Sequence, residues 1–487
     1  MMAETAKHGK TVSFPLPRSP LGPRRGLAPR SMTLLILACW ASGALAPNLP
    51  AQTLKDEVAP DSWQAPRRWT PAASPSGSSN YAAPPAASPA GDDWDAWASG
   101  LSAGDGNGPC CPDYCECWAD GGLCPSGRLE LRGDYLLWWG KGEHVPPLVT
   151  TSPVGTPRDQ AGVMGLNTTT VLFGNGDVNG EARSGERVTL DYWLGADQST
   201  AIEGDFVGLG DHRAKFAASS QGNPILARPF YNVSNTSTGP DSSLVAFTTA
   251  TTASALLTGS VDMSDRTSFC TAELLLRRNL VCQYGNRIDL LLGYRYARLA
   301  DDLQMSEFQK SEDPNGRLPE GTTLSLFDHF QTRNEFHGAQ VGMLTAWRRC
   351  AWSGEFLLKL GVGNTRSLVA IDGSTVITEP NQAPATYQGG LLALPTNIGQ
   401  SDHNQFTMIP ELGMTIGYDL TCRLRATVGY SLIYWSKVAR PGDQIDTNLN
   451  QTQFPPNTLV GVAQPQVHYT TTDFWAQGLN LGLDLRF

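Results

Sequence analysis

Three adjacent Asp–His pairs come closest, among the residues of this chain, to the parts of a catalytic site. A carboxylate that orients an imidazole, with another acid nearby, can activate a water molecule for hydrolysis. Adjacent polar residues are also common in loops, where their side chains often point apart. No nucleophile elbow, phosphate-binding glycine loop or H-E-x-x-H motif accompanies them. We therefore expect no enzyme, metal or cofactor, and we keep a hydrolase as the least favoured hypothesis. The pairs are Asp211-His212, Asp328-His329 and Asp402-His403.

A second and larger set of charged residues recurs at alternate positions of segments whose other positions are apolar. The set is mixed in sign. If these side chains share one interior they should pair across it, because an unpaired buried ion is costly. The set comprises Arg132, Asp134, Arg187, Asp191, Glu203, Asp205, Glu273, Arg277, Asp289, Arg295, Glu355, Lys359, Glu411, Arg423, Arg425, Asp484 and Arg486.

The segments that carry these charges have the alternation of β-strands with one apolar and one polar face. The last nine residues are the clearest case, with Leu479, Leu481, Leu483, Leu485 and Phe487 on one face. This aromatic ending resembles the signal that outer-membrane β-barrels present to their assembly machinery. Most segments are near the roughly 9–11 residues that a tilted strand needs to cross a bilayer. The others lie at 129–139, 187–194, 200–210, 270–281, 287–298, 336–348, 353–364, 408–419 and 423–434.

The connections between these segments are uneven in a regular way. Short turns on one side and long loops on the other are typical of outer-membrane barrels. We therefore predict an all-β fold: a transmembrane antiparallel up-and-down β-barrel of about ten strands, with twelve still open. Its short turns and both termini are periplasmic, and its long loops are extracellular. The short turns are expected around 195–199, 282–286, 349–352 and 420–422, and the long loops at 140–186, 211–269, 299–335, 365–407 and 435–474.

Aromatic residues test this topology, because amphipathic rings gather at the two interfaces of a membrane. One group is predicted beside the short turns and another toward the long loops. A soluble β-sandwich also alternates, but it explains neither the two aromatic levels nor the loop asymmetry. The first group is Trp193, Trp347, Trp352, Tyr418 and Phe487; the second is Trp138, Trp139, Tyr294, Tyr296, Tyr430, Tyr434, Trp435, Phe474 and Trp475.

Three segments precede the predicted barrel at 126–487. Residues 1–51 carry arginines before a short apolar run, which is typical of a secretory signal, and indicate export to the outer membrane. Residues 52–109 are rich in Pro, Ala, Ser and Gly, which predicts a flexible linker, and 110–125 form a cysteine-rich periplasmic lead-in. The net charge of −10 argues against a nucleic-acid partner.

Eight cysteines are expected on the periplasmic side, where an even number in an oxidising compartment suits disulfides. We predict that some turn cysteines staple the N-terminal cluster to the barrel floor; intermolecular bridges or no fixed pairing stay open. A metal site is disfavoured, because the spacing lacks two C-x-x-C pairs. The eight are Cys110, Cys111, Cys115, Cys117, Cys124, Cys282, Cys350 and Cys422.

Several segments in the region 129–487 occur in an order that matches a known family. Examples are RGDYLLWW at 132–139, LPTNIG at 394–399, YWSKVARPGDQID at 434–446 and DFWAQGLNLGLDLRF at 473–487. With these segments the chain resembles a family seen mostly in planctomycetes, the seventh family of putative β-barrel porins. The resemblance implies an outer-membrane barrel and brings no substrate, cofactor or catalytic residue.

The width of the lumen separates the two leading functional hypotheses. Eight strands enclose only side chains and wide channels need about 16, so ten should leave a narrow lumen. Either small solutes or ions pass through it passively, or paired charges hold it shut and the barrel has a structural or adhesive role at the surface. Glycines on the inner face could relieve crowding or leave space for water. Expected partners are outer-membrane lipid, the barrel assembly machinery and small solutes or ions, and oligomers stay possible.

Overall fold

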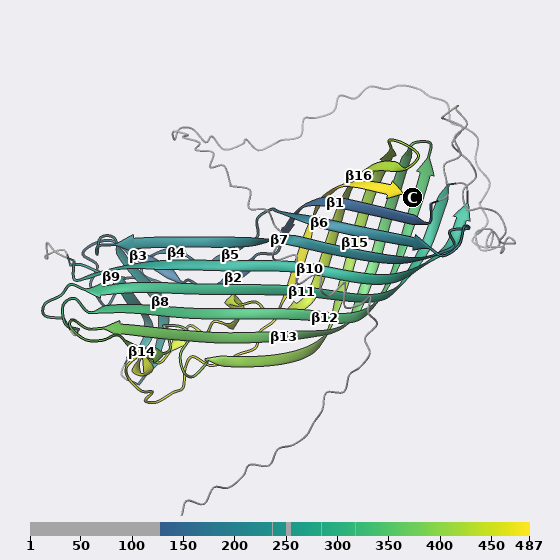
Figure 1. Cartoon of the computed structure of the whole chain (residues 1–487). Coiled ribbons are helices and arrows are strands. Elements are labelled where there is room, and N and C mark those ends of the chain that lie inside the picture. Colours follow the sequence, from purple (N-terminus) through teal and green to yellow (C-terminus); the bar gives the residue numbers. More distant parts are fainter. Residues whose placement is uncertain (1–126, 236, 250–254, 284, 317) are drawn as a thin grey trace, which may run out of the picture.

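Ten antiparallel strands close into a ring in the computed structural model, which describes residues 127–487 except 236, 250–254, 284 and 317 (Figure 1). Each strand of the ring pairs with the next one along the chain, and the first pairs with the last. The predicted ten-stranded up-and-down barrel is thereby confirmed. The ring strands are β1 (Leu129–Gly140), β6 (Arg183–Trp193), β7 (Thr200–Ser220), β10 (Leu257–Gln283), β11 (Asn286–Ser311), β12 (Thr323–Arg349), β13 (Trp352–Thr378), β15 (Gly399–Asp419), β16 (Leu424–Val438) and β18 (Thr472–Arg486).

The predicted signal (1–51), linker (52–109) and cysteine-rich lead-in (110–125) lie outside the described residues, so these assignments stay predictions. Within the described part of the chain, no helix is long and apolar enough to span a membrane.

The barrel has an apolar outer surface and a polar interior, the reverse of a soluble protein. In β18, Leu479 and Leu481 are 44% and 50% exposed, whereas the alternating Asn480 and Asp484 are buried. A surface of this kind is stable against hydrocarbon and would be costly in water. The strict alternation of the sequence therefore places the apolar side chains on the outside.

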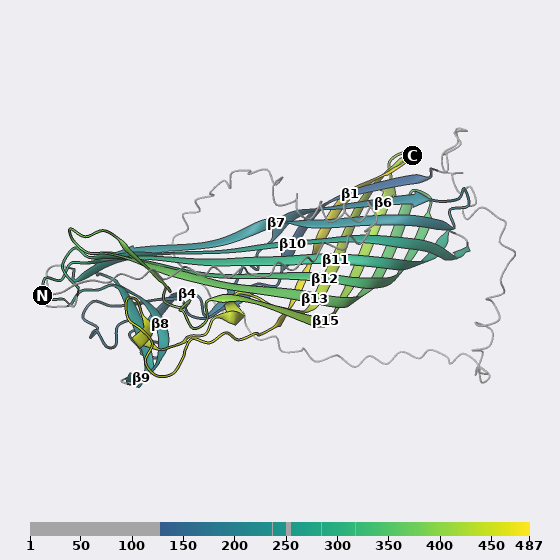
Figure 2. The same ribbon diagram turned by 60° about the horizontal axis from the view of Figure 1, so that its bottom comes forward.

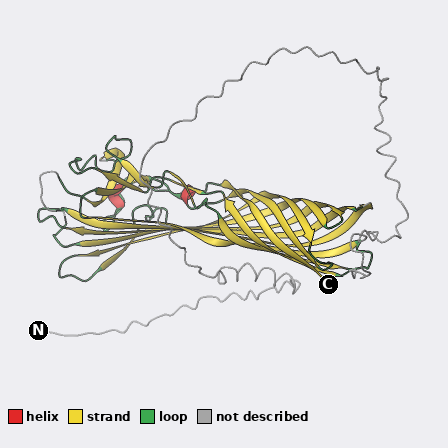
Figure 3. Cartoon of the chain, turned by 90° about the horizontal axis from the view of Figure 1, so that it is seen from above, coloured by secondary structure: helices red, strands yellow, loops and turns green. Residues whose placement is uncertain are grey.

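The strands are longer than the sequence predicts. β10, β12 and β13 have 27 residues each, well beyond the roughly 9–11 that cross a bilayer. They run past the ring as a curved sheet, seen in Figures 1 and 3. The short turns at one end and long connections at the other are as predicted, but the long connections begin later. They now span 141–182, 221–256, 312–322, 379–398 and 439–471.

The predicted boundaries are wrong because the phase of the alternation inverts along the strands. In β11 the apolar residues near the short turns face outward, as Leu292 does (46% exposed). Further along, Leu303 and Met305 face inward and are fully buried, and the polar Asp302 faces outward. The inversion marks the level at which the outer surface passes from an apolar to a polar environment.

The long connections fold into a packed head on the inner side of the extended strands (Figure 2). Its core joins Met263, Leu303 and Phe330 from the long strands to Leu226 and Phe230 from the head. These connections are therefore a second folded layer rather than open loops. The head contains β2 (Glu143–Val145), β3 (Val149–Ser152), β4 (Thr170–Phe173), β5 (Gly176–Val178), β8 (Ile225–Ser234), β9 (Ser237–Ala246), β14 (Ala385–Gln388), β17 (Asn448–Leu449) and the short helices η1 (Gly442–Gln444) and η2 (Gln451–Gln453).

The two aromatic levels exist, but several predicted members face the lumen. Near the short turns the exposed rings are Trp347, Trp352, Tyr418 and Phe487. Trp193 is instead buried, because it lies two residues after Asp191 in β6 and its side chain also points into the barrel. Toward the head, Trp139, Tyr294, Tyr430, Tyr434 and Trp475 keep the outward phase, as does the covered Tyr296, whereas Trp138, Trp435 and Phe474 point inward and are at most 1% exposed.

Candidate functional site

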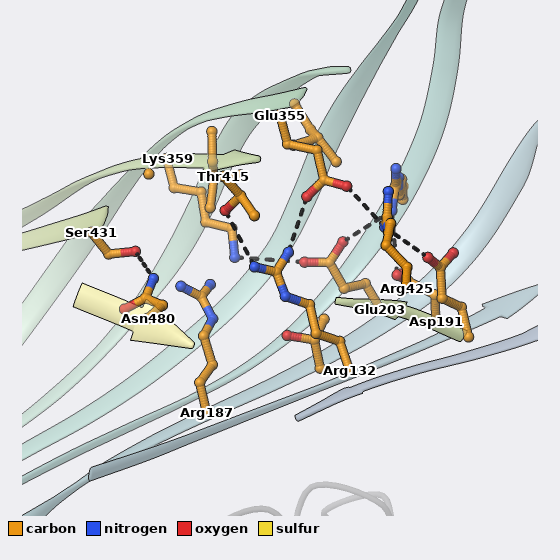
Figure 4. Close-up of a pocket in the computed structure, with 16 residues that line it drawn as sticks. Arg132, Arg187, Asp191, Glu203, Glu355, Lys359, Thr415, Arg425, Ser431 and Asn480 are labelled. Atoms are coloured by element: carbon orange, nitrogen blue, oxygen red, sulfur yellow. Dashed lines mark hydrogen bonds and ion pairs between the residues drawn. The ribbon is translucent and has the colours of Figure 1, made fainter. Parts of the chain in front are cut away.

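The lumen is filled by a network of ion pairs that we call the charge layer. Lys359 of β13 lies at its centre, with Nζ 2.8 Å from Glu273 and 3.5 Å from both Glu203 and Asp205. The Lys359 side chain is 0% exposed. Because these acids stand on β7 and β10, one lysine joins three strands across the interior. Figure 4 shows Lys359 beside Glu203.

Two arginines extend the charge layer around Glu411 of β15. Arg187 of β6 lies 3.2 Å from Glu411 and donates from Nε to Asp205 at 3.0 Å. Arg295 of β11 lies 3.0 Å from the other Glu411 oxygen and 3.3 Å from Glu273. Strands from opposite sides of the ring are thus tied together through single carboxylates.

The charge layer continues to the floor of the barrel. Arg425 contacts Asp484 and lies 3.1 Å from Glu355, which also accepts from Arg132 at 3.0 Å. On the opposite wall, Arg277 lies 2.7 Å from Asp289. Further contacts include Arg132–Asp134 (3.1 Å), Arg277–Asp191 (3.3 Å) and Arg486–Glu130 (3.5 Å).

The structure places every predicted lumen charge in this layer except Arg423, which is exposed in the turn before β16. Arg423 has the same alternation as the inward residues of β16, but the strand begins only at Leu424, so Arg423 lies outside the barrel wall. Arg287 was missed, although it alternates with Asp289. It lies 2.7 Å from Asp289 and 4.4 Å from the ring of Trp193, which closes the floor beneath it.

A layer of large apolar side chains, the apolar septum, lies on the head side of the charge layer. Trp138 and Trp435 are fully buried, and each indole N–H is satisfied: Trp138 donates to Asn480 at 2.7 Å and Trp435 to Thr365 at 3.0 Å. The further members are Leu136, Val207, Leu209, Phe269, Ala297, Leu299, Phe336, Ile409, Ile433, Val438, Phe474 and Ala476. Together they form one buried apolar cluster inside the ring.

A strap formed by residues 439–446 follows β16 on the head side of the septum. Asn334 of β12 holds it by accepting from the backbone N–H of Ala439 and donating to its carbonyl, both at 2.8 Å. The next residue, Arg440, is 1% exposed and lies 3.0 Å from Asp301. Burial raises the pKa of Asp301, and burial with the neighbouring Asp301 charge raises the pKa of Asp265 to about 7.

The free space in the charge layer is small. A cavity of about 100 Å³ remains among its side chains, which is room for a few water molecules. Inner glycines relieve crowding there: a Cβ at Gly482 would lie 2.0 Å from an Asp134 oxygen, and one at Gly417 would lie 2.5 Å from Ser353. Of the two roles considered for these glycines, crowding relief fits these positions.

The Asp–His pairs lie within strands rather than in loops, so the two side chains of each pair point to opposite faces. Asp328, for example, faces inward and accepts from the backbone N–H groups of Leu391, Leu392 and Ala393, while His329 faces outward to Asp302 at 3.0 Å. No aspartate orients its neighbouring histidine. The others behave alike: Asp211 contacts Arg266, His212 lies 3.1 Å from Glu181, Asp402 contacts Arg366, and His403 stacks on Tyr469.

The turn cysteines lie at the floor. Cys282 is the next-to-last residue of β10, beside the short turn, and Cys350 and Cys422 are exposed in turns. The five cysteines from Cys110 to Cys124 lie outside the described residues, so the proposed stapling stays a prediction. Within the described residues, no group of three or more His, Cys, Asp or Glu side chains is arranged to hold a metal ion.

A closed ring of ten strands, with an apolar outer band and a charged interior, defines this chain as an outer-membrane β-barrel. The family model described as "Putative beta barrel porin-7 (BBP7)" matches residues 131–487, and the chain belongs to that family. Outer-membrane lipid is therefore its surrounding medium.

Solved structures give only distant likenesses. The outer membrane protease OmpT from Escherichia coli is 10% identical with a TM-score of 0.34, over 76% of this chain and 99% of that one. The CymD monoaromatic hydrocarbon channel is 7% identical with a TM-score of 0.17, over 75% and 91%. A Pseudomonas aeruginosa FadL homologue is 10% identical with a TM-score of 0.15, over 73% and 89%. No curated protein matches the sequence.

Proposed function

We propose that this protein is a closed outer-membrane barrel whose role is to anchor and display the packed head at the cell surface. The observation that carries the proposal is the apolar septum. Trp138, Phe336 and Trp435 are all fully buried in the middle of the lumen. A hydrated ion that crossed this layer would have to shed water among mostly apolar side chains, which is costly.

Two further features support a closed barrel. The charge layer below the septum leaves a cavity of about 100 Å³, and its acids and bases are already paired. The strap above the septum is held by Asn334 and Arg440 through contacts of 2.8 and 3.0 Å. A solute would therefore have to displace three successive layers.

The second candidate function is a narrow pore for small solutes or ions. The name of the family and the polar, water-sized cavity in the charge layer favour it. In this case the strap and the septum must move together to give a continuous path. No catalytic activity is proposed, because none of the three Asp–His pairs has an aspartate against its own histidine.

The assembly of the barrel is a further part of the proposal. The outward Leu479, Leu481, Leu483 and Leu485 of β18 and the terminal Phe487 after it are 37–58% exposed. We propose that the barrel assembly machinery recognises this ending after export through the N-terminal signal.

A liposome-swelling assay on the purified full chain tests the proposal. We expect no swelling above empty liposomes with arabinose, glycine or potassium chloride as solutes, beside a general porin as positive control. Rapid swelling with any of these solutes would favour the pore instead. Display of the head is tested separately, by labelling a small epitope inserted in the 312–322 connection on intact cells.

A further inference from the structure

The outer surface of β7 and β10–β13 changes character within a few residues at the upper membrane interface. Tyr294 and Tyr296 of β11 and His337 of β12 form an aromatic group there, with the Tyr294 hydroxyl 2.5 Å from His337 Nδ1. Below them the outward side chains are apolar, such as Leu292 and Val341. Rings of this kind mark the level of lipid headgroups.

Three arginines stand directly above this aromatic group. Arg298 of β11 is opposite Glu335 of β12, and Glu335 is opposite Arg366 of β13. Arg333 lies two residues before Glu335 on the same outward face, 3.9 Å from it. Arg366 also contacts Asp402 of β15. The three guanidinium groups of this arginine patch therefore face two carboxylates, which leaves one net positive charge.

A second level continues the patch upward. Arg213 of β7 and Arg266 of β10 are directly opposite each other on neighbouring strands. Like charges in this position destabilise a sheet, because their side chains are close. Asp211 contacts Arg266 and offsets part of the repulsion. Two cross-strand arginines in this position fit an environment that supplies anions.

The arginines are confined to one side of the barrel. The outward positions of β1, β6, β15, β16 and β18 carry none, and near the head they present Trp139, Tyr434 and Trp475 instead. A general need for solubility would place arginines all around the ring, whereas the outward charges on β6 and β15 include the acids Glu186 and Asp402. The one-sided arrangement, continuous with the lipid-facing band, points to a defined ligand in the outer leaflet.

We propose that the arginine patch (Arg298, Arg333 and Arg366) binds the phosphate groups of a phosphorylated glycolipid in the outer leaflet. The acyl chains of this lipid lie against Leu292 and Val341, and its sugar packs at the level of Tyr294 and His337. Guanidinium groups suit phosphate because they form paired, charge-assisted hydrogen bonds with its oxygens. Arg366 donates to Asp402 from Nε and Nη2, but 57% of its side chain stays exposed to a phosphate.

Native mass spectrometry of the full chain in detergent tests this site. The probes are a diphosphorylated lipid A and the same lipid after removal of both phosphates. We expect the wild type to prefer the phosphorylated lipid about fivefold, because each arginine near a membrane surface contributes roughly 1 kcal/mol and Glu335 and Asp402 together offset about two of the three. The triple variant R298Q/R333Q/R366Q should lose this preference, and E335Q should strengthen it.

The matched control is R278Q/R348Q/R349Q, which removes three arginines at the opposite end of the barrel and should keep the preference. Heat-dependent migration on a gel checks that every variant is folded. Equal binding of both lipids by the wild type would overturn the proposal. The same conclusion follows if the triple variant keeps the preference, if the control loses it equally, or if E335Q weakens binding.

Discussion

Substitution of Lys359 by methionine probes the charge layer most sharply, because methionine keeps the volume of the side chain and removes its charge. Lys359 has one contact of 2.8 Å and two of 3.5 Å with carboxylates. At an effective dielectric constant of about 20, Coulomb's law gives roughly 6 kcal/mol for the first contact and roughly 5 kcal/mol for each of the others. Most of this gross attraction offsets the cost of burying the ions.

The net effect of K359M on stability is smaller than this gross attraction, because it is the cost of leaving buried carboxylates without one of their positive partners. Glu203, Asp205 and Glu273 then face one another with less compensation, and we expect a loss of about 3–5 kcal/mol in the free energy of unfolding. Equilibrium unfolding by urea in detergent micelles, followed by tryptophan fluorescence, measures it. The double variant E273Q/K359M should regain about 1–2 kcal/mol, because it removes one uncompensated acid.

Lys310 provides a matched control. It also lies 2.8 Å from a glutamate, Glu312, but its side chain is 43% exposed. An exposed pair contributes at most about 1 kcal/mol, so K310M should change the free energy of unfolding by less than that. If K359M costs no more than K310M, the reasoning about a cross-linking charge layer is refuted.

Two further predictions concern crowding in the lumen and pH. G482A should cost about 1–3 kcal/mol in unfolding free energy, because its Cβ would meet Asp134, whereas G133A on the neighbouring strand has open space and should be neutral; equal effects would contradict the packing described. The hydrogen bond and charge of Asp302 raise the pKa of His329 in the folded protein. The pair therefore contributes its full stabilisation of the folded state below the unfolded pKa of about 6.5, and this contribution is lost as pH rises through the folded pKa. Unfolding of wild type and D302N should therefore differ more at pH 5.5 than at pH 8.5, by less than about 1 kcal/mol because the pair is part-exposed; a larger difference at pH 8.5 would be the wrong sign.

The ring of ten strands could be predicted because alternation and turn spacing are local signals. Leu479 to Leu485 alternate with polar residues, and once the turn spacing indicates a membrane barrel this pattern fixes which side faces lipid. The lumen charges followed from the same phase, as for Lys359 and Glu411. The position of Arg423 was predicted wrongly, because it fits the inward alternation but the strand starts one residue later.

The head and the septum could not be predicted, because they depend on contacts between distant segments. The outward polar residues of β11, such as Asp302, look like loop residues until the inward Leu303 and Met305 are seen to pack on the head. Trp138 and Trp435 were assigned to the membrane interface by residue type, although their phase points inward. Each is buried in the apolar cluster inside the ring.

Single-channel recording in a planar bilayer tests the closed lumen most directly. The purified full chain is inserted and recorded under applied voltage, with a general porin as a control for insertion. The layered lumen predicts a baseline without discrete conductance steps, in the presence or absence of reductant. Steady, uniform steps from the wild-type protein would contradict it, because ions would then cross the apolar septum in the native state.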